Sequence, residues 1–291
     1  MTRRPNYHAY VRFLDTPAKP GGDQQVHDAD IYINRNCPGE NMEFASATAG
    51  GVVMRQYFSS HLLAGAGKLA ELAKQIESRH SGEPKFDLEH RGYVLSSIVS
   101  SAGFLESMIN ELFQDAHDGH APEGGAVTSL STCTIRSMSE YWQSTEKGKG
   151  KKAATLEKYQ ALLCSAGKPI LDRGERLYQD AALVVRLRNI ILHFHPEDLP
   201  ASNPQTRERA LRTIEAELGA RKFNDNRLMM GSGNTWWPDK CLGFGCAQWA
   251  LRAVTNLTDH IVDAVQVRPN YVVHRATGWL GNVPGASDNG L

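Results

Sequence analysis

Apolar residues recur at three- and four-residue steps along residues 91–116, and this pattern restricts the fold more than any other feature. The repeat consists of Leu95, Ile98, Ala102, Leu105, Ile109 and Leu112. Residues at this spacing share one face of an α-helix, so the segment is predicted to be an amphipathic helix. Such a face is stable only when other elements cover it. A fold in which further helices pack against this one is therefore expected.

Other segments carry helical patterns of the same kind. Helices are predicted over residues 52–78, 126–145, 155–163, 178–194, 207–220 and 246–265. Prolines 196 and 200 close the helix over 178–194. Residues 146–152, Glu-Lys-Gly-Lys-Gly-Lys-Lys, are expected to form a flexible basic linker. The predicted fold class is mainly α, a helical bundle.

The first 50 residues lack helical periodicity. Residues 7–13 and 30–34 contain β-branched and aromatic residues between turn-forming segments, which predicts a short strand pair. We therefore expect an irregular N-terminal extension over 1–85, containing these strands and one helix that packs on the bundle. The bundle is expected over 86–267 and a C-terminal tail over 268–291.

Charge, apolar runs and cysteine content indicate which class of protein this is. The chain has 291 residues, with 32 Lys and Arg against 32 Asp and Glu, so any phosphate-binding surface must be a local patch. The start has no apolar run of the kind found in secretory signal peptides. No stretch approaches about 18 uninterrupted apolar residues, so no membrane span is expected. Five scattered cysteines are typical of reduced thiols. These features predict a cytoplasmic protein.

Two patterns that suggest ligand binding are incomplete. Residues 65–68, Gly-Ala-Gly-Lys, lack the first glycine and the following Ser or Thr of a phosphate-binding loop. Residues 115–120 offer two Asp and two His as metal ligands, but no second cluster completes a closed site. A polar helix end is the favoured interpretation there. Neither a metal nor a cofactor is expected.

Polar side chains gather on one side of the helix over 178–194. Arg186, Asn189 and His193 form an i, i+3, i+7 stripe, and Arg188 lies beside it. The opposite arc is apolar and is expected in the core: Leu183, Leu187, Ile190, Ile191 and Phe194. The alternative is an ordinary solvated helix face.

Two apolar residues interrupt this polar face. Val185 and Leu192 lie between its charged members. Branched apolar side chains in that position indicate a face that meets another helix or another subunit.

The run Arg188-Asn189-Ile-Ile-Leu-His193 resembles the Arg-x4-His signature of HEPN domains, including the polar residue after Arg. Residues 102–112 resemble the first bundle helix of such proteins. The resemblance covers residues 90–200 and, more loosely, the C-terminal helix. It implies a bundle of four to five helices that forms a homodimer, with the two Arg-x4-His helices facing one cleft. It also implies metal-independent endoribonuclease activity, associated with toxin–antitoxin and phage-defence systems.

The chemistry of RNA cleavage agrees with these residue types. When the 2′-hydroxyl attacks the phosphate, a proton must leave it and another must reach the 5′-oxygen, and His193 can serve as base or acid. The Arg188 guanidinium can hold two phosphate oxygens as negative charge develops. Asn189 can orient the imidazole or bind the phosphate. The expected partners are RNA, a second copy of the chain, and an antitoxin or defence-system partner.

Other residues are expected to support this site. Glu106 lies on a mostly apolar helix edge, where a carboxylate needs a partner. We predict that this partner is Arg188 or Arg186; a Glu106 that faces solvent at the bundle rim is the alternative. Asn110 belongs to the same helix and is included in the site. Arg186 and the segment 147–152 are expected to contact phosphate.

One position departs from a subset of HEPN toxins. Those silenced by a nucleotidyltransferase antitoxin carry a Tyr two residues after the His, where this chain has His195. Control by nucleotide transfer is therefore not expected. His195 is predicted either to join the site or to cap the helix before Pro196. The alternative function is a catalytically inactive HEPN-like module that binds RNA, a nucleotide or a protein.

Overall fold

The computed structural model describes the backbone of residues 10–13, 31–32, 44–45, 52–119, 126–194 and 209–276. Side chains are described for residues 56–119, 126–194 and 213–276. His195, one of the predicted site residues, lies outside these ranges. The chain divides into two compact units, Met1–Gln56 and Tyr57–Leu291.

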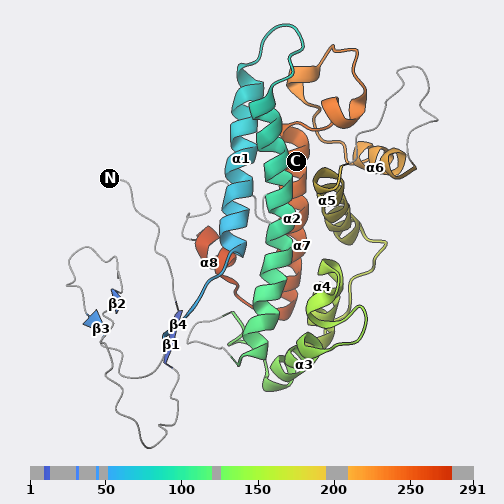
Figure 1. Ribbon diagram of the computed structural model, residues 1–291. Coiled ribbons are helices and arrows are strands. Elements are labelled where there is room, and N and C mark those ends of the chain that lie inside the picture. Colours follow the sequence, from blue (N-terminus) through green and yellow to red (C-terminus); the bar gives the residue numbers. More distant parts are fainter. Residues whose placement is uncertain are drawn as a thin grey trace, which may run out of the picture. The chain divides into compact units, whose positions relative to one another are not determined.

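Three long helices form the centre of the second unit. They are α1 (Ser59–Arg79), α2 (Leu88–His117) and α7 (Phe244–Val265), which lie side by side in Figure 1. The apolar face predicted for residues 91–116 is buried; Ile98, Leu105 and Ile109 have no exposed surface. Because α2 contacts α1, α3, α4, α5 and α7, it is the central helix.

By length and composition alone, α2 is long and apolar enough to cross a membrane. It is the one such helix in the described part of the chain, judged by length and hydropathy. Half of the apolar stretch is buried inside the bundle, and the core helix of a soluble protein has the same properties. Its place at the centre of the bundle accounts for its apolar character.

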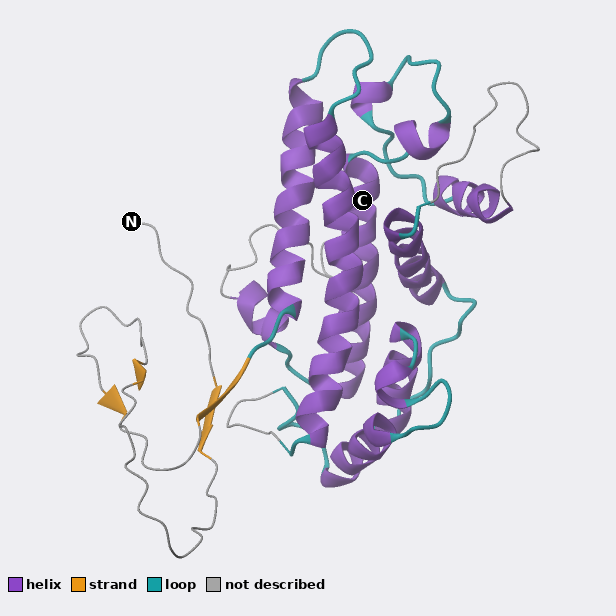
Figure 2. Cartoon of the chain, in the orientation of Figure 1, coloured by secondary structure: helices purple, strands orange, loops and turns teal. Residues whose placement is uncertain are grey.

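Shorter helices pack around this trio. They are α3 (Thr132–Gln143), α4 (Thr155–Ser165), α5 (Arg176–Leu192), α6 (Arg209–Gly219) and α8 (Asn270–Ala276). α3 and α4 pack on α2, α5 contacts both α2 and α7, α6 contacts α5, and α8 contacts α1. The predicted mainly α fold is confirmed, with helices in purple in Figure 2.

α5 packs on the core with most of the predicted residues, and Ile190 and Ile191 are partly buried against it. Leu183 and Leu187 are buried as expected, together with Val184, whereas Phe194 is 53% exposed. The helix ends at Leu192, two residues earlier than predicted. Phe194 therefore does not continue the helical arc on which its burial was predicted.

The described residues of the first unit form four short strands in two antiparallel pairs. β1 (Tyr10–Phe13) pairs with β4 (Val52–Arg55), and β2 (Ile31–Tyr32) pairs with β3 (Phe44–Ala45). The predicted pairing of 7–13 with 30–34 is therefore wrong, although both segments contain strands. The predicted helix start at Val52 is also wrong, because the run Val-Val-Met-Arg suits a strand and has β1 as its partner.

The boundary between the units differs from the expected division at residue 85. It falls before α1, because α1 packs along α2 and belongs to the bundle. The expected tail over 268–291 contributes α8, whose Tyr271 is fully buried.

The segment expected to be a flexible basic linker is folded against α3. It ends in a 3-10 turn, η1 (Gly150–Lys152), and Gly150 is buried with a φ of 65°. A Cβ at this position would collide with the backbone oxygen of Ser144, so only glycine fits. Lys151 Nζ lies 5.7 Å from the centroid of the Trp142 ring. The linker prediction failed because this close packing is not visible in composition.

A carboxylate of α2 holds the start of α1. Glu111 accepts hydrogen bonds from the backbone N–H groups of Phe58 (2.8 Å) and Ser59 (2.9 Å), and from the Ser59 hydroxyl (2.5 Å). N–H groups at a helix start have no partner within the helix and carry partial positive charge. One turn further along α2, Asp115 accepts a hydrogen bond from the Tyr57 hydroxyl at 2.9 Å. These two carboxylates fix the point where the bundle begins.

Glu111 should make stability depend on pH in a defined direction. Burial raises the pKa of its carboxyl above the ordinary 4.5, although the bonds from Ser59 and Phe58 act the other way. The folded protein then binds this proton more tightly than the unfolded chain does, so the resulting stabilisation is complete below pH 4.5 and lost as the pH rises through the raised pKa.

Comparison with Glu111→Gln isolates this effect. The free energy of unfolding of the wild type minus that of the variant should fall as the pH rises through this window. Urea unfolding over about pH 4 to 8 measures the difference. A difference that increases with pH would contradict the assignment.

Candidate functional site

α2 and α5 bring three predicted site residues together around one guanidinium. Arg188 donates from Nη2 to Glu106 Oε2 at 2.8 Å and from Nη1 to Asn189 Oδ1 at 2.9 Å. The side chains of Arg188 and Glu106 are 27% and 42% exposed, so the pair lies at the edge of the bundle. The predicted ion pair between Glu106 and Arg188 is confirmed.

Arg186, the other predicted partner of Glu106, is bound elsewhere. It forms a short ion pair with Glu217 of α6. A second pair, between Asp180 of α5 and Arg221, two residues past the end of α6, has a distance of 2.6 Å. Arg186 therefore helps to hold α6 in this structure, and its contact with phosphate stays a prediction.

Asn110 contacts a lysine that was not predicted at the site. It lies one turn after Glu106 on α2, and its Oδ1 accepts a hydrogen bond from Lys158 Nζ of α4 at 2.8 Å. Lys158 is 2% exposed, and its Nζ lies 5.3 Å from the centroid of the Trp142 ring. Burial lowers the pKa of Lys158, while the charge of Glu106 acts in the opposite direction.

The sequence did contain a signal for Lys158. It lies next to Tyr159 and one turn before Leu162, and both of these are buried. A lysine on the core side of a predicted helix needs a polar partner or a function. That partner, Asn110, is 48 residues away in the chain.

His193 lies just past the end of α5. It is the C-cap residue, with φ −115° and ψ 34°, and its backbone N–H still donates to the carbonyl oxygen of Asn189 at 2.9 Å. Its ring is exposed and makes no hydrogen bond within the described part of the chain.

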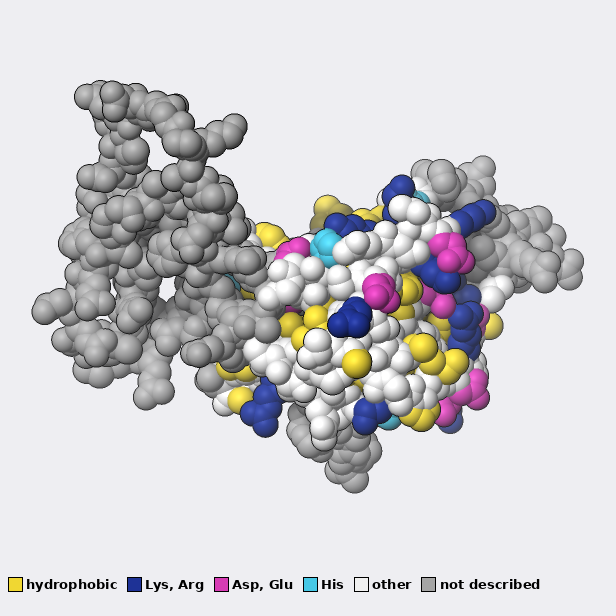
Figure 3. All heavy atoms as spheres, turned by 90° about the horizontal axis from the view of Figure 1, so that it is seen from below, with side chains coloured by type: hydrophobic (Ala, Val, Ile, Leu, Met, Phe, Trp, Pro, Cys, Tyr) yellow, Lys and Arg dark blue, Asp and Glu magenta, His cyan; other side chains and the backbone are white. Residues whose placement is uncertain are grey.

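Apolar side chains flank this histidine. Leu192 is 54% exposed and Phe194 is 53% exposed, whereas Val185 is half-buried and packs on the core. Contact of this end of α5 with another subunit stays a prediction. On the face of the molecule shown in Figure 3, basic and acidic side chains of the described residues are interspersed. That view agrees with a neutral total charge and shows no large area of one sign.

The polar residues at the end of α2 serve the bundle. Asp115 binds Tyr57, Asp118 accepts from Gln114, and His117 Nδ1 lies 2.9 Å from Gln143 Nε2. Among the described residues, no group of three or more His, Cys, Asp and Glu side chains is placed to hold a metal ion. His120, the last residue of this run, lies outside the described residues.

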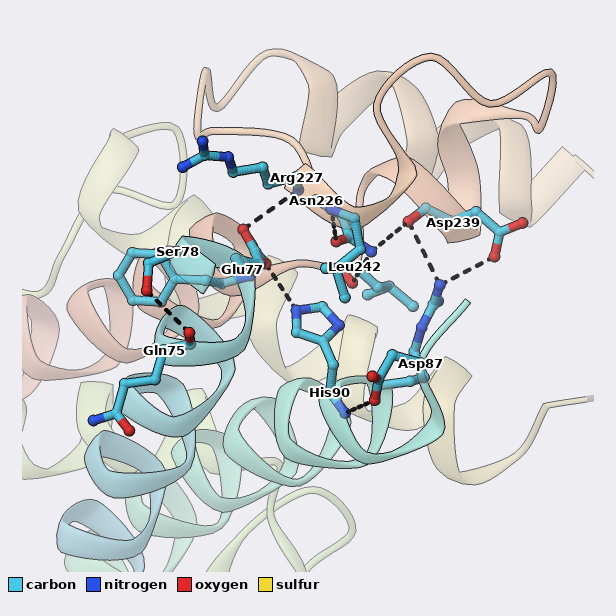
Figure 4. A network of polar contacts seen from close by, with 12 residues as sticks. Gln75, Glu77, Ser78, Asp87, His90, Asn226, Arg227, Asp239 and Leu242 are labelled. Carbon is cyan, nitrogen blue, oxygen red and sulfur yellow. Dashed lines mark hydrogen bonds and ion pairs between the residues drawn. The ribbon is translucent and has the colours of Figure 1, made fainter. Parts of the chain in front are cut away.

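A second polar cluster lies where α1 ends and α2 and α7 begin, and is shown in Figure 4. Glu77 is buried, and its Oε1 accepts a hydrogen bond from the backbone N–H of Phe244 at 2.6 Å. The same oxygen lies 2.8 Å from Nε2 of the buried His90. Its Oε2 accepts from the backbone N–H of Arg227 at 3.4 Å. Glu77 therefore caps α7 and joins three parts of the chain.

The rest of this cluster holds residues 224–243 on the bundle. Asn226 donates to the carbonyl oxygens of Asp239 (3.1 Å) and Leu242 (3.4 Å). Arg91 of α2 forms an ion pair with the Asp239 carboxylate at 3.0 Å. A Cβ on Gly243 would lie 2.5 Å from the Cα atom of Asn226, so this close approach of two backbone segments requires glycine. Because these groups bond to one another and to backbone, we assign the cluster a structural role.

No protein-family model, curated protein or solved structure matches the chain.

Proposed function

We propose that the protein is a metal-independent endoribonuclease of the HEPN type, which cleaves RNA by attack of the 2′-hydroxyl. We further propose that it is a cytoplasmic toxin or defence effector. The observation that carries the proposal is the arrangement around Arg188. Glu106 and Asn189 hold its guanidinium on the helix that ends at the exposed imidazole of His193.

The contacts of Arg188 leave it able to bind phosphate. A guanidinium has five N–H donors, and the bonds to Glu106 and Asn189 use one donor on each terminal nitrogen. The remaining donors suit the oxygens of a phosphodiester, where they would stabilise the charge that develops during attack. Because two side chains fix the guanidinium, little orientation is lost on binding.

His193 would move the protons. Its ring is not engaged by the described residues, so it can accept the proton of the 2′-hydroxyl or donate one to the leaving 5′-oxygen. One chain offers one such histidine, and the two steps need a base and an acid. We therefore propose a homodimer through the end of α5, with exposed Leu192 and Phe194 as its apolar contacts. An antitoxin or defence-system protein is the further proposed partner.

Incubation with total RNA in the presence of EDTA tests the proposal. The wild type should cleave RNA to products with 2′,3′-cyclic phosphate ends, because the attacking group is the neighbouring hydroxyl. His193→Ala should not cleave. Cleavage that survives this substitution would show that the site is assigned wrongly.

An inactive HEPN-like module that binds RNA, a nucleotide or a protein is the second candidate. The observation that favours it is the ion pair in which Glu106 compensates the charge of Arg188. An ion pair with no catalytic role would have the same geometry. RNA that is bound but not cleaved by either protein would select this candidate.

The substitution Glu106→Gln should separate activity from stability. The ion pair with Arg188 is half-exposed, so its loss should change the free energy of unfolding by less than about 1 kcal/mol. The guanidinium would lose its main restraint, and the turnover number for RNA should fall roughly tenfold. Urea unfolding and steady-state kinetics measure the two effects. A large loss of stability with unchanged turnover would contradict the proposed role.

A further inference from the structure

Two cationic side chains, from α4 and α5, contact the same face of α2. Glu106 and Asn110 are four residues apart and so lie on the same helix face. Arg188 reaches Glu106 from α5, and Lys158 reaches Asn110 from α4. The group thus contains two positive charges and one negative charge. Its net charge is positive before His193 is counted.

The burial of Lys158 is not explained by a need for stability. Its ammonium forms no ion pair within the described part of the chain; its hydrogen-bond partner is the neutral amide of Asn110. Burying a charge without an opposite charge in direct contact costs free energy, and an apolar residue of similar volume is often as stable or more so. A lysine held in this way is a candidate for a functional role.

The surroundings keep the ammonium in place. The Trp142 ring lies 5.3 Å from Lys158 Nζ, stacks on Phe113 at 5.6 Å, and donates from Nε1 to Gln114 at 2.8 Å. Lys151 also lies over this ring. A cation over an aromatic face is attracted to it, so the ring favours positive charge here.

We propose that Lys158 converts the Glu106–Arg188 pair into a phosphodiester-binding site. It is a positioning residue: its buried charge offsets that of Glu106, so that Arg188 keeps its attraction for an anion. In a region of low dielectric this charge acts on the half-exposed pair without touching the ligand. The identification of the anion as RNA backbone rests on the proposed function. The charge balance of the site follows from the contacts alone and does not depend on that function.

Charge substitutions should shift binding of a non-cleavable probe in opposite directions. The probe is a fluorescent single-stranded 2′-deoxyoligonucleotide, whose missing 2′-hydroxyls prevent cleavage. Lys158→Met should weaken binding roughly tenfold, and Glu106→Gln should tighten it several-fold. The double variant should bind with nearly wild-type affinity, because it restores the net charge. Lys168→Met, at an exposed position after α4, is the matched control and should have little effect.

Stability distinguishes this role from a structural one. Lys158→Met should melt at the same temperature as the wild type or higher, since a buried charge is removed. A lower melting temperature with unchanged affinity of the folded protein would overturn the inference. If Lys158→Met does not fold, Glu106→Gln decides alone, and unchanged or weaker probe binding would reject the proposal.

The outcomes separate the inference from the proposed function. Probe binding that follows the charges of Lys158 and Glu106, in a protein that never cleaves RNA, would support the site and reject the nuclease. If the wild type cleaves RNA but probe binding does not change when Lys158 or Glu106 is replaced, the nuclease is supported and the inference about Lys158 is rejected. A wild type that binds no probe at low salt would refute the inference.

Discussion

Replacing His193 by alanine should lower the rate of RNA cleavage by roughly 100- to 10,000-fold, the range that general acid–base catalysis contributes. The side chain follows the last residue of α5, is exposed, and contacts no described side chain by hydrogen bonding. Its removal should therefore leave the fold intact. Single-turnover cleavage of a labelled oligoribonucleotide in EDTA measures the effect on the chemical step.

His80 offers a matched control. It occupies the same position relative to α1 that His193 occupies relative to α5, directly after the last helical residue. His80→Ala should cleave RNA at the wild-type rate and melt at nearly the same temperature. An equal loss of activity in both variants would mean that histidines at helix ends matter here for reasons other than catalysis. A His193→Ala variant that remains active would remove the histidine from the mechanism.

The long helices were predictable because their signal is local. Apolar residues at helical spacing placed α2 and α7 within a few residues of their observed bounds. Strand pairing was not predictable in the same way. Segments 10–13 and 31–32 are strands, but the choice between their partners depends on contacts distant in the chain, and a short strand carries little information about its partner.

At the candidate site, the ion pair between Glu106 and Arg188 followed from one simple argument, that a carboxylate on an apolar helix edge needs a partner. Lys158 and Glu77 are also charged side chains on the buried sides of their helices, and each of them needs a partner. Glu77 continues a row of buried alanines on α1, at residues 66, 70 and 73. Its hydrogen-bond partners, Arg227 and Phe244, are 150 and 167 residues away in the chain. The sequence therefore indicates that Glu77 needs a partner but does not identify that partner.

Glu77→Ala should destabilise the bundle by about 3 kcal/mol or more, the largest effect on stability that we expect from a single polar side chain here. The substitution leaves the buried His90 ring and the N–H of Phe244 without their acceptor. It also removes a negative charge from the start of α7, where the helix dipole favours one. Urea unfolding followed by circular dichroism measures the change in free energy.

Glu71→Ala is the matched control, since Glu71 is a glutamate of the same helix with a partly exposed side chain and a weak pair to Lys74 at 3.7 Å. It should change the free energy of unfolding by less than about 1 kcal/mol. Loss of Glu77 should also loosen residues 224–243 before the bundle unfolds, because Glu77 bonds to Arg227 at one end of this segment and Phe244 just after the other. Trypsin should then cut after Arg227 or Lys240 faster in Glu77→Ala than in Glu71→Ala. Equal stability and equal cleavage in the two variants would show that the contacts of Glu77 do not hold the segment.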